Sequence, residues 1–222
     1  MSDTRERLME AAISALKRQG IAGVSARTIA GEIGANQALV FYHFKTVEGL
    51  LAAAALRETG LRLDRYRPAF EAAGSLRELL SLGQRLHEEE RAAGNVALIG
   101  QFLAGSTGQP QLAEATAAAL QLWTDELRRV LERLYAGHPL GEFLDLPNLA
   151  RAVAAGFVGL ELYEGVDPRG AAGAFSALDR LGALVEVVDG LGPVVSRAVR
   201  AKLRREVGRE VGREADLGGA AR

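Results

Sequence analysis

The chain of 222 residues contains no cysteine, and aromatic residues make up only 5% of it. The absence of cysteine excludes disulfides, cysteine-ligated metals, iron–sulfur clusters and thiol nucleophiles. No apolar run is long enough to span a bilayer, and the N-terminal stretch lacks the pattern of a signal peptide, so we expect a cytoplasmic protein with no membrane partner. The formal net charge of -1 argues against indiscriminate polyanion binding, so any nucleic-acid surface has to be local.

The sequence also lacks the short motifs of several enzyme classes. It has no His-Glu-x-x-His, no Glu-x-x-His and no Gly-x-Ser-x-Gly, and no glycine-rich loop precedes Lys17, Lys45 or Lys202. Helical zinc and di-iron sites, serine hydrolases and P-loop enzymes are therefore not indicated. His87 lies in a His-Glu-Glu-Glu run, which we interpret as a solvated helix face. We expect no cofactor, no metal and no catalytic residue, with a helical-bundle enzyme as a minor alternative.

Helix-forming residues dominate what is present. Ala, Leu, Glu and Arg are abundant, and no segment shows the alternation of a strand, so the prediction is an all-α protein of about nine to ten helices. Capping residues, glycines and prolines predict helices at about 3–19, 25–33, 37–44, 46–67, 75–93, 96–103, 110–136, 147–164 and 169–190, and a last one from Pro193.

These helices group into a small head and a larger body. We expect a head at residues 1–50, a helical body at 51–205 with the helix at 46–67 linking the two, and a polar tail at 206–222 that is frayed or disordered. The end of the linking helix is placed near Pro68, because proline breaks helix interiors.

The second and third predicted helices, joined by a tight turn at Gly34, have the layout of a helix-turn-helix, whose second helix enters the DNA major groove. At 100° per residue, Val40 and Phe44 share the face that packs inward. Tyr42 and His43 point outward, as do Ala38 and Leu39. Such an exposed apolar and aromatic face predicts a partner surface. DNA is the favoured partner, and a protein partner bound by the same head surface without DNA is the alternative.

The stretch GVSARTIAGEIGANQALVFYHFKTVEGLL, residues 23–51, resembles the DNA-binding signature of the tetracycline-repressor (TetR) family, and YHFKT is its most diagnostic part. The resemblance covers roughly the first 55 residues. It implies a three-helix DNA-binding head, a helical body for ligand binding and dimerisation, and a regulator, most often a repressor, that a small-molecule inducer releases from a palindromic operator in double-stranded DNA.

Carried over by position, the resemblance also implies which residues contact DNA. These residues are Arg27, Thr28, Gln37, Ala38, Leu39, Tyr42, His43 and Lys45. Three positions depart from the family pattern: Val47 stands where a lysine is usual, Leu39 replaces Ser or Thr, and Phe41 replaces a common Tyr. A phosphate contact and a groove hydrogen bond are therefore expected to be missing.

In the body the sequence gives weaker signals. Candidate ligand-binding residues, chosen as large aromatics and polar anchors, are Gln101, Phe102, Thr116, Trp123, Phe157 and Glu161. The small residues Ala152, Ala155, Gly156 and Gly159 form a stripe on which another helix can approach closely. The family resemblance implies that the two penultimate helices form a dimer interface, so a homodimer is expected, with ordinary internal packing as the alternative for the stripe.

Overall fold

The computed structural model describes residues 2–138, 141–189 and 201–202. In these ranges the chain is helical, with no strand, which confirms the all-α prediction. The helices are α1 (Ser2–Gln19), η1 (Ile21–Gly23), α2 (Ala26–Glu32), α3 (Ala38–Phe44), α4 (Val47–Ala72), α5 (Leu76–Ala92), α6 (Asn95–Ser106), α7 (Pro110–Leu134), η2 (Gly141–Phe143), α8 (Leu146–Glu164) and α9 (Pro168–Asp189). Apart from residues 201–202, the predicted helix from Pro193 lies outside the described residues, and so does the polar tail at 206–222.

Side-chain caps begin these helices where the sequence predicts them. The hydroxyl oxygens of Ser25, Thr46 and Ser75 accept hydrogen bonds from backbone N–H groups in the first turns of α2, α4 and α5. Asn36 Oδ1 accepts from the N–H of Ala38 at 2.8 Å and so caps α3. Each cap satisfies a backbone donor that has no partner within the helix.

The turn between α2 and α3 depends on one glycine. Gly34 has φ = 66°, in the left-handed region that side chains with a Cβ rarely adopt. This matches the expected left-handed stop after α2. The turn is therefore short, and it fixes the angle at which α3 leaves α2.

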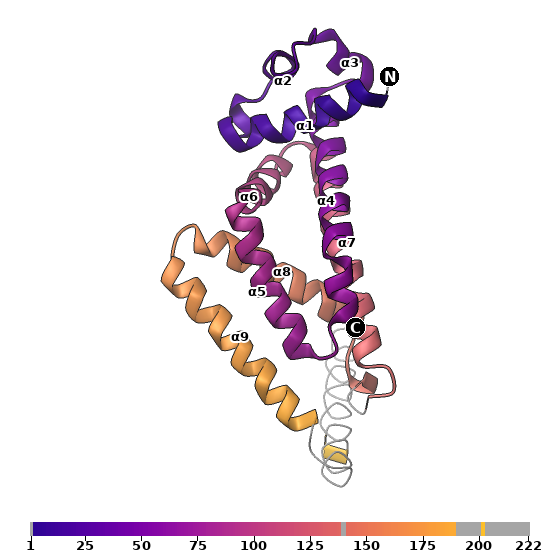
Figure 1. Cartoon of the computed structure of the whole chain (residues 1–222), viewed down its shortest axis with the longest axis vertical. Coiled ribbons are helices and arrows are strands. Elements are labelled where there is room, and N and C mark those ends of the chain that lie inside the picture. The colour runs from indigo at the N-terminus through magenta and orange to yellow at the C-terminus, as the bar shows by residue number, and fades with distance from the viewer. Residues whose placement is uncertain (1, 139–140, 190–200, 203–222) are drawn as a thin grey trace, which may run out of the picture.

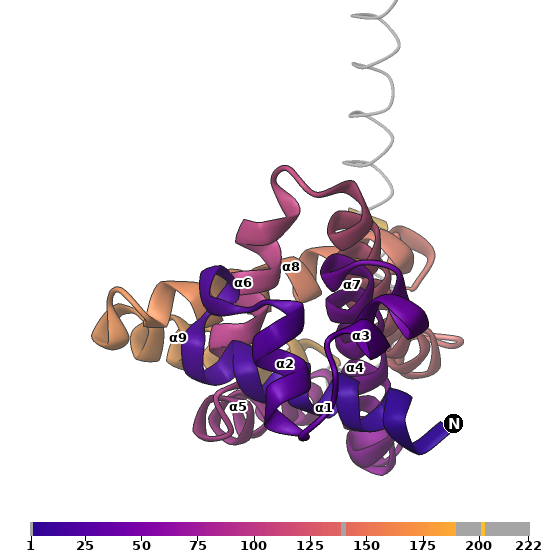
Figure 2. The same ribbon diagram turned by 90° about the horizontal axis from the view of Figure 1, so that it is seen from above.

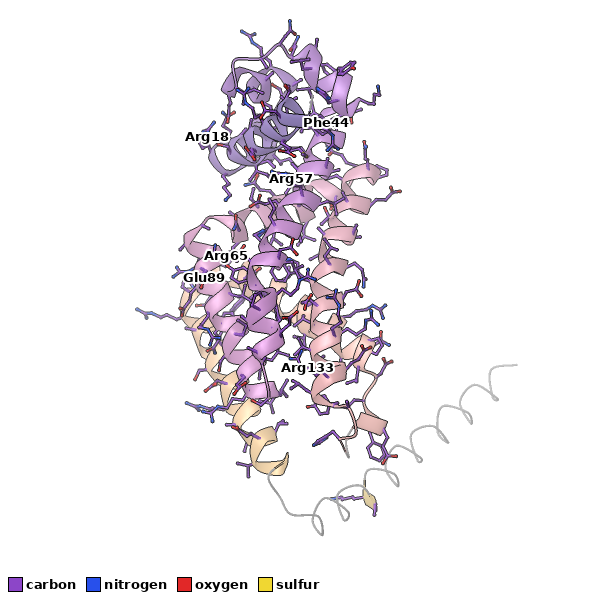
Figure 3. All side chains as sticks on the ribbon, turned by 45° about the vertical axis from the view of Figure 1, so that its right-hand side comes forward. Arg18, Phe44, Arg57, Arg65, Glu89 and Arg133 are labelled. Atoms are coloured by element: carbon purple, nitrogen blue, oxygen red, sulfur yellow. The ribbon has the colours of Figure 1, made fainter. Side chains whose placement is uncertain are left out.

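The predicted end of α4 near Pro68 is wrong, because α4 continues to Ala72 with Pro68 inside it. Phe70, in the extra turn, is buried in the body core. The guanidinium of Arg133 donates hydrogen bonds to the carbonyl oxygens of Phe70 (2.9 Å) and Ala73 (2.7 Å), and Figure 3 labels it beside this end of α4. Tertiary packing and this cap outweigh the hydrogen bond that proline cannot make.

Two apolar clusters organise the molecule. The first joins α1, α2, α3 and the start of α4, and it also includes Leu98, Phe102 and Leu112 from α6 and α7. The second lies lower in the body and joins α4, α5, α7 and α8. The head sits at one end of the long α4–α7 pair (Figure 1). Helix α8 packs against α7, and α9 lies on the outer side of the body against α5 and α8.

Within the described ranges, no single helix has the length and apolarity needed to span a bilayer. Helices α3 and α4 pass that test only when they are taken together, by length and composition, and they meet at 64°.

Candidate nucleic-acid interface

The orientation of α3 is set by two inward side chains. Val40 is fully buried and Phe44 is 7% exposed, and both belong to the head core together with Ile29 of α2. The guanidinium carbon of Arg5 lies 5.0 Å from the centroid of the Phe44 ring, which adds a cation–π contact at this anchor. The inward face of α3 is therefore the one that the helical periodicity predicts.

The opposite face of α3 presents aromatic side chains to solvent. Tyr42 is 61% exposed and Phe41 48% exposed. The half-buried His43 ring packs edge-on to Tyr42, with ring centroids 4.9 Å apart. Seen from above the head in Figure 2, α2 and α3 lie on the outer side of the molecule, away from the body. This face is available to a partner in the single chain.

The other residues expected to contact DNA differ in exposure. Arg27, Gln37, Ala38 and Lys45 are exposed. Leu39 is half-buried and packs against the head core. It therefore offers a partner less surface than its predicted outward position on α3 implies. The Thr28 hydroxyl accepts a hydrogen bond from the N–H of Ser25 (2.8 Å) and donates one to its carbonyl oxygen (3.0 Å), so Thr28 holds the start of α2.

Charge is distributed unevenly over the head. The acidic side chains of Glu10 and Glu32 are paired with Arg57 and Arg18, respectively. Among the described residues, Arg27 and Lys45 form no ion pair. In the described part of the head, the cations without an ion pair thus include Arg27 at the start of α2 and Lys45 after α3.

Lys45 also has an unusual backbone. Its φ of 68° makes it the one non-glycine residue with positive φ among those described. This conformation directs the chain from α3 into α4, where Thr46 caps the next helix. Strained residues of this kind are frequent at functional sites, and the backbone here presents the Lys45 side chain at the edge of the α3 face.

The candidate ligand residues do not form one group. Phe102 is buried in the head cluster, and Gln101 Nε2 donates to the carbonyl oxygen of Leu16 at 3.4 Å, so both lie at the junction of head and body. Thr116 donates to the carbonyl oxygen of Leu112 in its own helix. Trp123 packs against Tyr66 and Phe70 between α4 and α7.

Phe157 and Glu161 lie together on α8, next to His87 of α5. The prediction that His87 lies on a solvated helix face is wrong. His87 is only 4% exposed, not on a solvated face. Its Nε2 is 2.8 Å from Glu164 Oε2, its Nδ1 is 3.7 Å from Glu161 Oε1, and its ring lies edge-on to Phe157. The apolar positions Leu79, Leu82 and Leu86 of α5 continue to His87 and Glu90 on the same buried face, a spacing that points to this burial.

Glu161 is the most perturbed carboxyl of the body. Burial, followed by the negative charges of Glu90 and Glu164, raises its pKa to about 7, and Arg62 partly opposes this rise. Burial also raises the pKa of Tyr66, whose hydroxyl donates to Glu90 Oε1 at 3.0 Å. A buried ionisable group with charged neighbours is typical of a functional site. Within the described residues, no group of three or more side chains has the arrangement of a metal site.

The small-residue stripe of α8 lies on the surface of the single chain. Ala152, Ala155, Gly156 and Gly159 are all exposed, and a Cβ added at either glycine would meet no atom within 4 Å. Large apolar side chains nearby are also exposed, among them Leu162 (40%). The stripe therefore does not serve packing within the described part of the chain.

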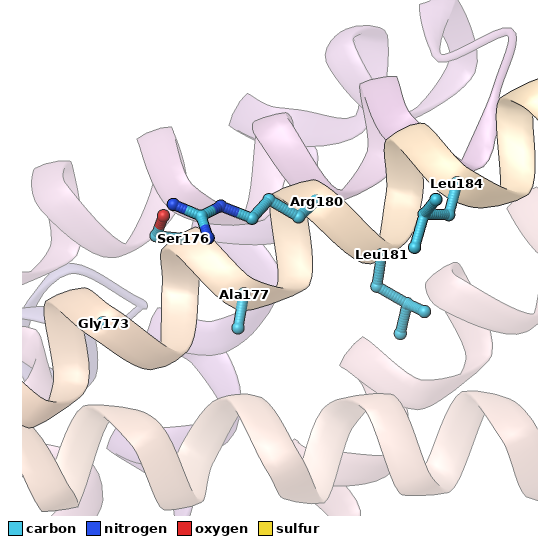
Figure 4. Close-up of a pocket in the computed structure, with 6 residues that line it drawn as sticks. All are labelled: Gly173, Ser176, Ala177, Arg180, Leu181 and Leu184. Carbon is cyan, nitrogen blue, oxygen red and sulfur yellow. The ribbon is translucent and has the colours of Figure 1, made fainter.

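On α9, Leu181 is 54% exposed and Leu184 63% exposed. They line a depression that runs along α9, with Arg180 extended over Ser176 (Figure 4). Because one helix supplies every lining residue, this depression fits a packing surface better than an enclosed ligand pocket.

Comparisons with known proteins agree with the head and with the fold. Residues 8–54 match the model of bacterial regulatory proteins of the tetR family. A structure from Rhodococcus sp., assigned as a TetR-family transcriptional regulator, is 24% identical, covers 86% of this chain and 100% of its own, and has a TM-score of 0.69. A transcriptional regulator from Streptomyces coelicolor A3(2) is 27% identical over 80% of this chain and 97% of its own, with a TM-score of 0.62.

A third structure, a transcriptional regulator from Saccharomonospora viridis in complex with choline, is 23% identical, covers 81% of this chain and 95% of its own, and has a TM-score of 0.63. No curated protein sequence matches the chain.

Proposed function

Because the chain belongs to the tetR family of bacterial regulatory proteins, we propose that it is a homodimeric repressor, released from a palindromic operator by a small-molecule inducer. Membership of the family places it among DNA-binding regulators and not among enzymes. Beyond family membership, we propose the release by an inducer, the dimeric assembly and the residues that contact DNA.

The observation that carries the proposal is the orientation of α3. Val40 and Phe44 hold its inner face in the head core, whereas Tyr42 lies outward with 61% of its surface exposed. An α-helix fits the major groove of B-form DNA, and its first residues approach the base edges. Gln37 and Ala38 occupy that end of α3, where Gln suits adenine and Ala suits a thymine methyl group.

Dimerisation is proposed through α8 and α9. Exposed small residues of α8 allow close helix approach, and Leu181 and Leu184 of α9 expose apolar surface that a monomer rarely leaves in water. A two-fold axis between these helices would place two heads on one side of a duplex. Half-sites would then lie about 34–36 Å apart, one helical turn of DNA.

The proposed response to a ligand is a coupling between body and head. Helix α6 contributes Leu98 and Phe102 to the head core, so a shift of α6 in the body changes the support of the head. The choline complex of the Saccharomonospora viridis regulator supports the binding of a small molecule by a protein of this fold. A coupling of about 1–3 kcal/mol would change operator affinity by about 5- to 150-fold.

The test is a mobility shift with the DNA that flanks the chain's own gene. The wild-type protein is expected to shift this DNA, and a variant with Tyr42→Ala and Lys45→Ala is expected not to. Both side chains are exposed, so the far-ultraviolet circular dichroism of the variant should remain that of the wild type.

A matched control is Arg67→Ala, which removes an exposed cation from the body and should leave the shift unchanged. If neither protein shifts DNA, or if the head variant shifts it as well as the wild type does, the proposal is wrong. The same head surface would then favour a protein partner.

A further inference from the structure

The middle of the body contains more buried negative charge than positive charge. We name the acidic cluster by its members: Arg62 of α4, His87 and Glu90 of α5, and Glu161 and Glu164 of α8. Glu161 is 2% and Glu90 7% exposed. Arg62 NH1 lies 2.7 Å from Glu90 Oε2 and is the one guanidinium of the cluster. Three carboxyl groups therefore face one permanent cation.

The surrounding groups do little to balance this charge. Arg91 approaches Glu164 only to 3.9 Å, and its side chain is 62% exposed. The hydroxyl of Tyr66 donates to Glu90, and Asn95 Nδ2 donates to Glu90 Oε2 at 2.8 Å. Both are neutral donors, so the excess of negative charge around Glu161 persists.

Several buried acceptors of the cluster make no hydrogen bond. Among the described residues, Glu161 Oε2 and His87 Nδ1 of the cluster and Oδ1 of Asn95, which is bonded to Glu90, are buried and have no hydrogen-bond partner. A buried polar atom without a partner costs about 1–3 kcal/mol, and a buried ionised carboxylate costs more. The amide oxygen of Asn95 can only accept, and so can the oxygens of Glu161 once this carboxyl is ionised, so a group that satisfies both has to carry N–H or O–H donors.

The arrangement does not suit a metal ion. His87 presents Nε2 to Glu164 and Nδ1 to Glu161, and these two nitrogens lie on different sides of the ring. One ion cannot be bound by both pairs at coordination distance. No metal-binding group of three side chains occurs in the described ranges, in agreement with this geometry.

We propose that the acidic cluster binds the protonated nitrogen of a small organic amine, with Glu161 as its principal acceptor. The inference deepens the proposed function, on which it rests, by giving the chemical class of the ligand. An ammonium group supplies both the positive charge and the N–H donors that the unpartnered acceptors require. Charge-assisted hydrogen bonds of this kind are roughly twice as strong as neutral ones.

Aromatic rings next to the cluster fit the organic part of such a ligand. The rings of Phe157 and Phe175 lie 6.1 Å and 4.8 Å from the His87 ring, centroid to centroid, and both are half-buried. Glu164, bonded to His87, is 22% exposed. The cluster therefore reaches solvent at its Glu164 edge. An aromatic face attracts a cation once water is excluded.

The raised pKa of Glu161 also supports the binding of an amine at the acidic cluster. Its pKa, raised to about 7 by burial, means that about half of the free protein carries a proton on this carboxyl at pH 7. A bound ammonium group would stabilise the carboxylate and release that proton. The charged and titratable groups that act on Glu161 are Arg62 from α4, His87 and Glu90 from α5 and Glu164 from α8. Tyr66 from α4 and Asn95 from α6 donate hydrogen bonds to Glu90.

The test is calorimetric titration of the full chain at pH 8 and fixed ionic strength with three compounds that share one skeleton. Benzylammonium chloride carries charge and N–H groups, benzyltrimethylammonium chloride carries charge only, and benzyl alcohol carries neither a charge nor an N–H group. We expect benzylammonium to bind about tenfold or more tightly than either of the others, because charge-assisted hydrogen bonds are lost in both. At pH 7, titrations in two buffers of different ionisation enthalpy should show proton release.

Two variants locate the site. Glu161→Gln is expected to weaken benzylammonium binding by about tenfold or more, and Glu164→Gln at the exposed edge is expected to weaken it to a smaller extent. The matched control is Glu88→Gln, an exposed carboxylate on α5 beside His87, which should leave binding within about twofold. Circular dichroism verifies that each variant folds.

Equal binding of benzylammonium and benzyl alcohol, binding that is unchanged in Glu161→Gln, or no binding of benzylammonium would overturn the amine site. A mobility shift with the same preparations separates this result from failure of the proposed function. Protein that shifts DNA and binds no amine refutes the amine site alone, whereas protein that binds the amine through Glu161 and shifts no DNA refutes the regulator.

Discussion

The ammonium group of Lys17, in the head, donates a hydrogen bond of 2.9 Å to the carbonyl oxygen of Ala93, which follows α5 in the body. Next to Ala93, Gly94 has φ = 73°, and Asn95 begins α6 while its side chain donates to Glu90 of the acidic cluster. The corner between α5 and α6 is therefore bonded to the head on one side and to the cluster on the other. These contacts connect Glu90 of the acidic cluster to Lys17 of the head through the α5–α6 corner.

Replacing Lys17 tests the value of this contact. Lys17→Met keeps the aliphatic stem and removes the donor, so we expect the free energy of unfolding to fall by about 1 kcal/mol. Urea denaturation followed by circular dichroism measures the change. Arg85→Met, at an exposed position of α5, is the control and should stay within about 0.5 kcal/mol of the wild type. Equal stability of both variants would show that the Lys17 bond contributes nothing.

Glycine substitutions test the connection between α3 and α4. A Cβ added at Gly49 would lie 2.5 Å from the carbonyl oxygen of Phe44, so Gly49→Ala is expected to displace α3 and destabilise the chain by about 2 kcal/mol. DNA affinity should fall with it.

Gly31→Ala is the matched control, because Gly31 lies in α2 with no atom within 4 Å of an added Cβ. It is expected to stabilise the chain by up to about 1 kcal/mol, since alanine favours helix. Thermal unfolding of both variants measures the difference, and a Gly49→Ala variant as stable as Gly31→Ala would contradict the packing described here.

The sequence predicts the head better than it predicts the body. In the head, local signals agree with tertiary packing: the caps at Ser25, Asn36 and Thr46 and the turn at Gly34 lie where the pattern places them. Inward Val40 and outward Tyr42 follow from helical periodicity alone. Short helices with strong caps leave few alternatives, which is why local rules suffice there.

The body depends on contacts between residues far apart in the sequence. Pro68 predicts a helix end, but burial of Phe70 and the bonds from Arg133, 63 positions away, extend α4 past it. The sequence around His87 predicts a solvated position, but Glu161 and Glu164 of α8, more than 70 positions later, contact its ring in the folded chain. Periodicity in α5 indicates burial of this position but does not identify its partner.

The pH dependence of stability tests the environment of Glu161. Its pKa is raised from an ordinary 4.5 to about 7, so folding favours the protonated form. This contribution to stability is full below about pH 4.5 and is lost as pH rises toward 7, by about 3 kcal/mol for a shift of this size. Urea denaturation at pH 5 and pH 8 should therefore show a larger loss of stability in the wild type than in Glu161→Gln. Parallel losses in the two proteins would show that Glu161 titrates normally.

The apolar face of α9 tests the proposed assembly. Leu181→Glu combined with Leu184→Glu places two charges on exposed apolar positions of one helix face. We expect the wild type to sediment as a dimer and the double variant as a monomer, because each buried charge without a partner opposes association. Leu61→Glu, at a 52% exposed position of α4, is the control. A double variant that still sediments as a dimer would move the interface elsewhere.

The most direct test of the α3 face is the salt dependence of operator binding by fluorescence anisotropy. A dimer that neutralises about six phosphates predicts that log affinity falls with log salt with a slope of about −5. Lys45→Ala should reduce the slope by about 2, one contact in each subunit, and should weaken binding uniformly across DNA sequences. A flat salt dependence, or a slope that Lys45→Ala does not change, would contradict the interface.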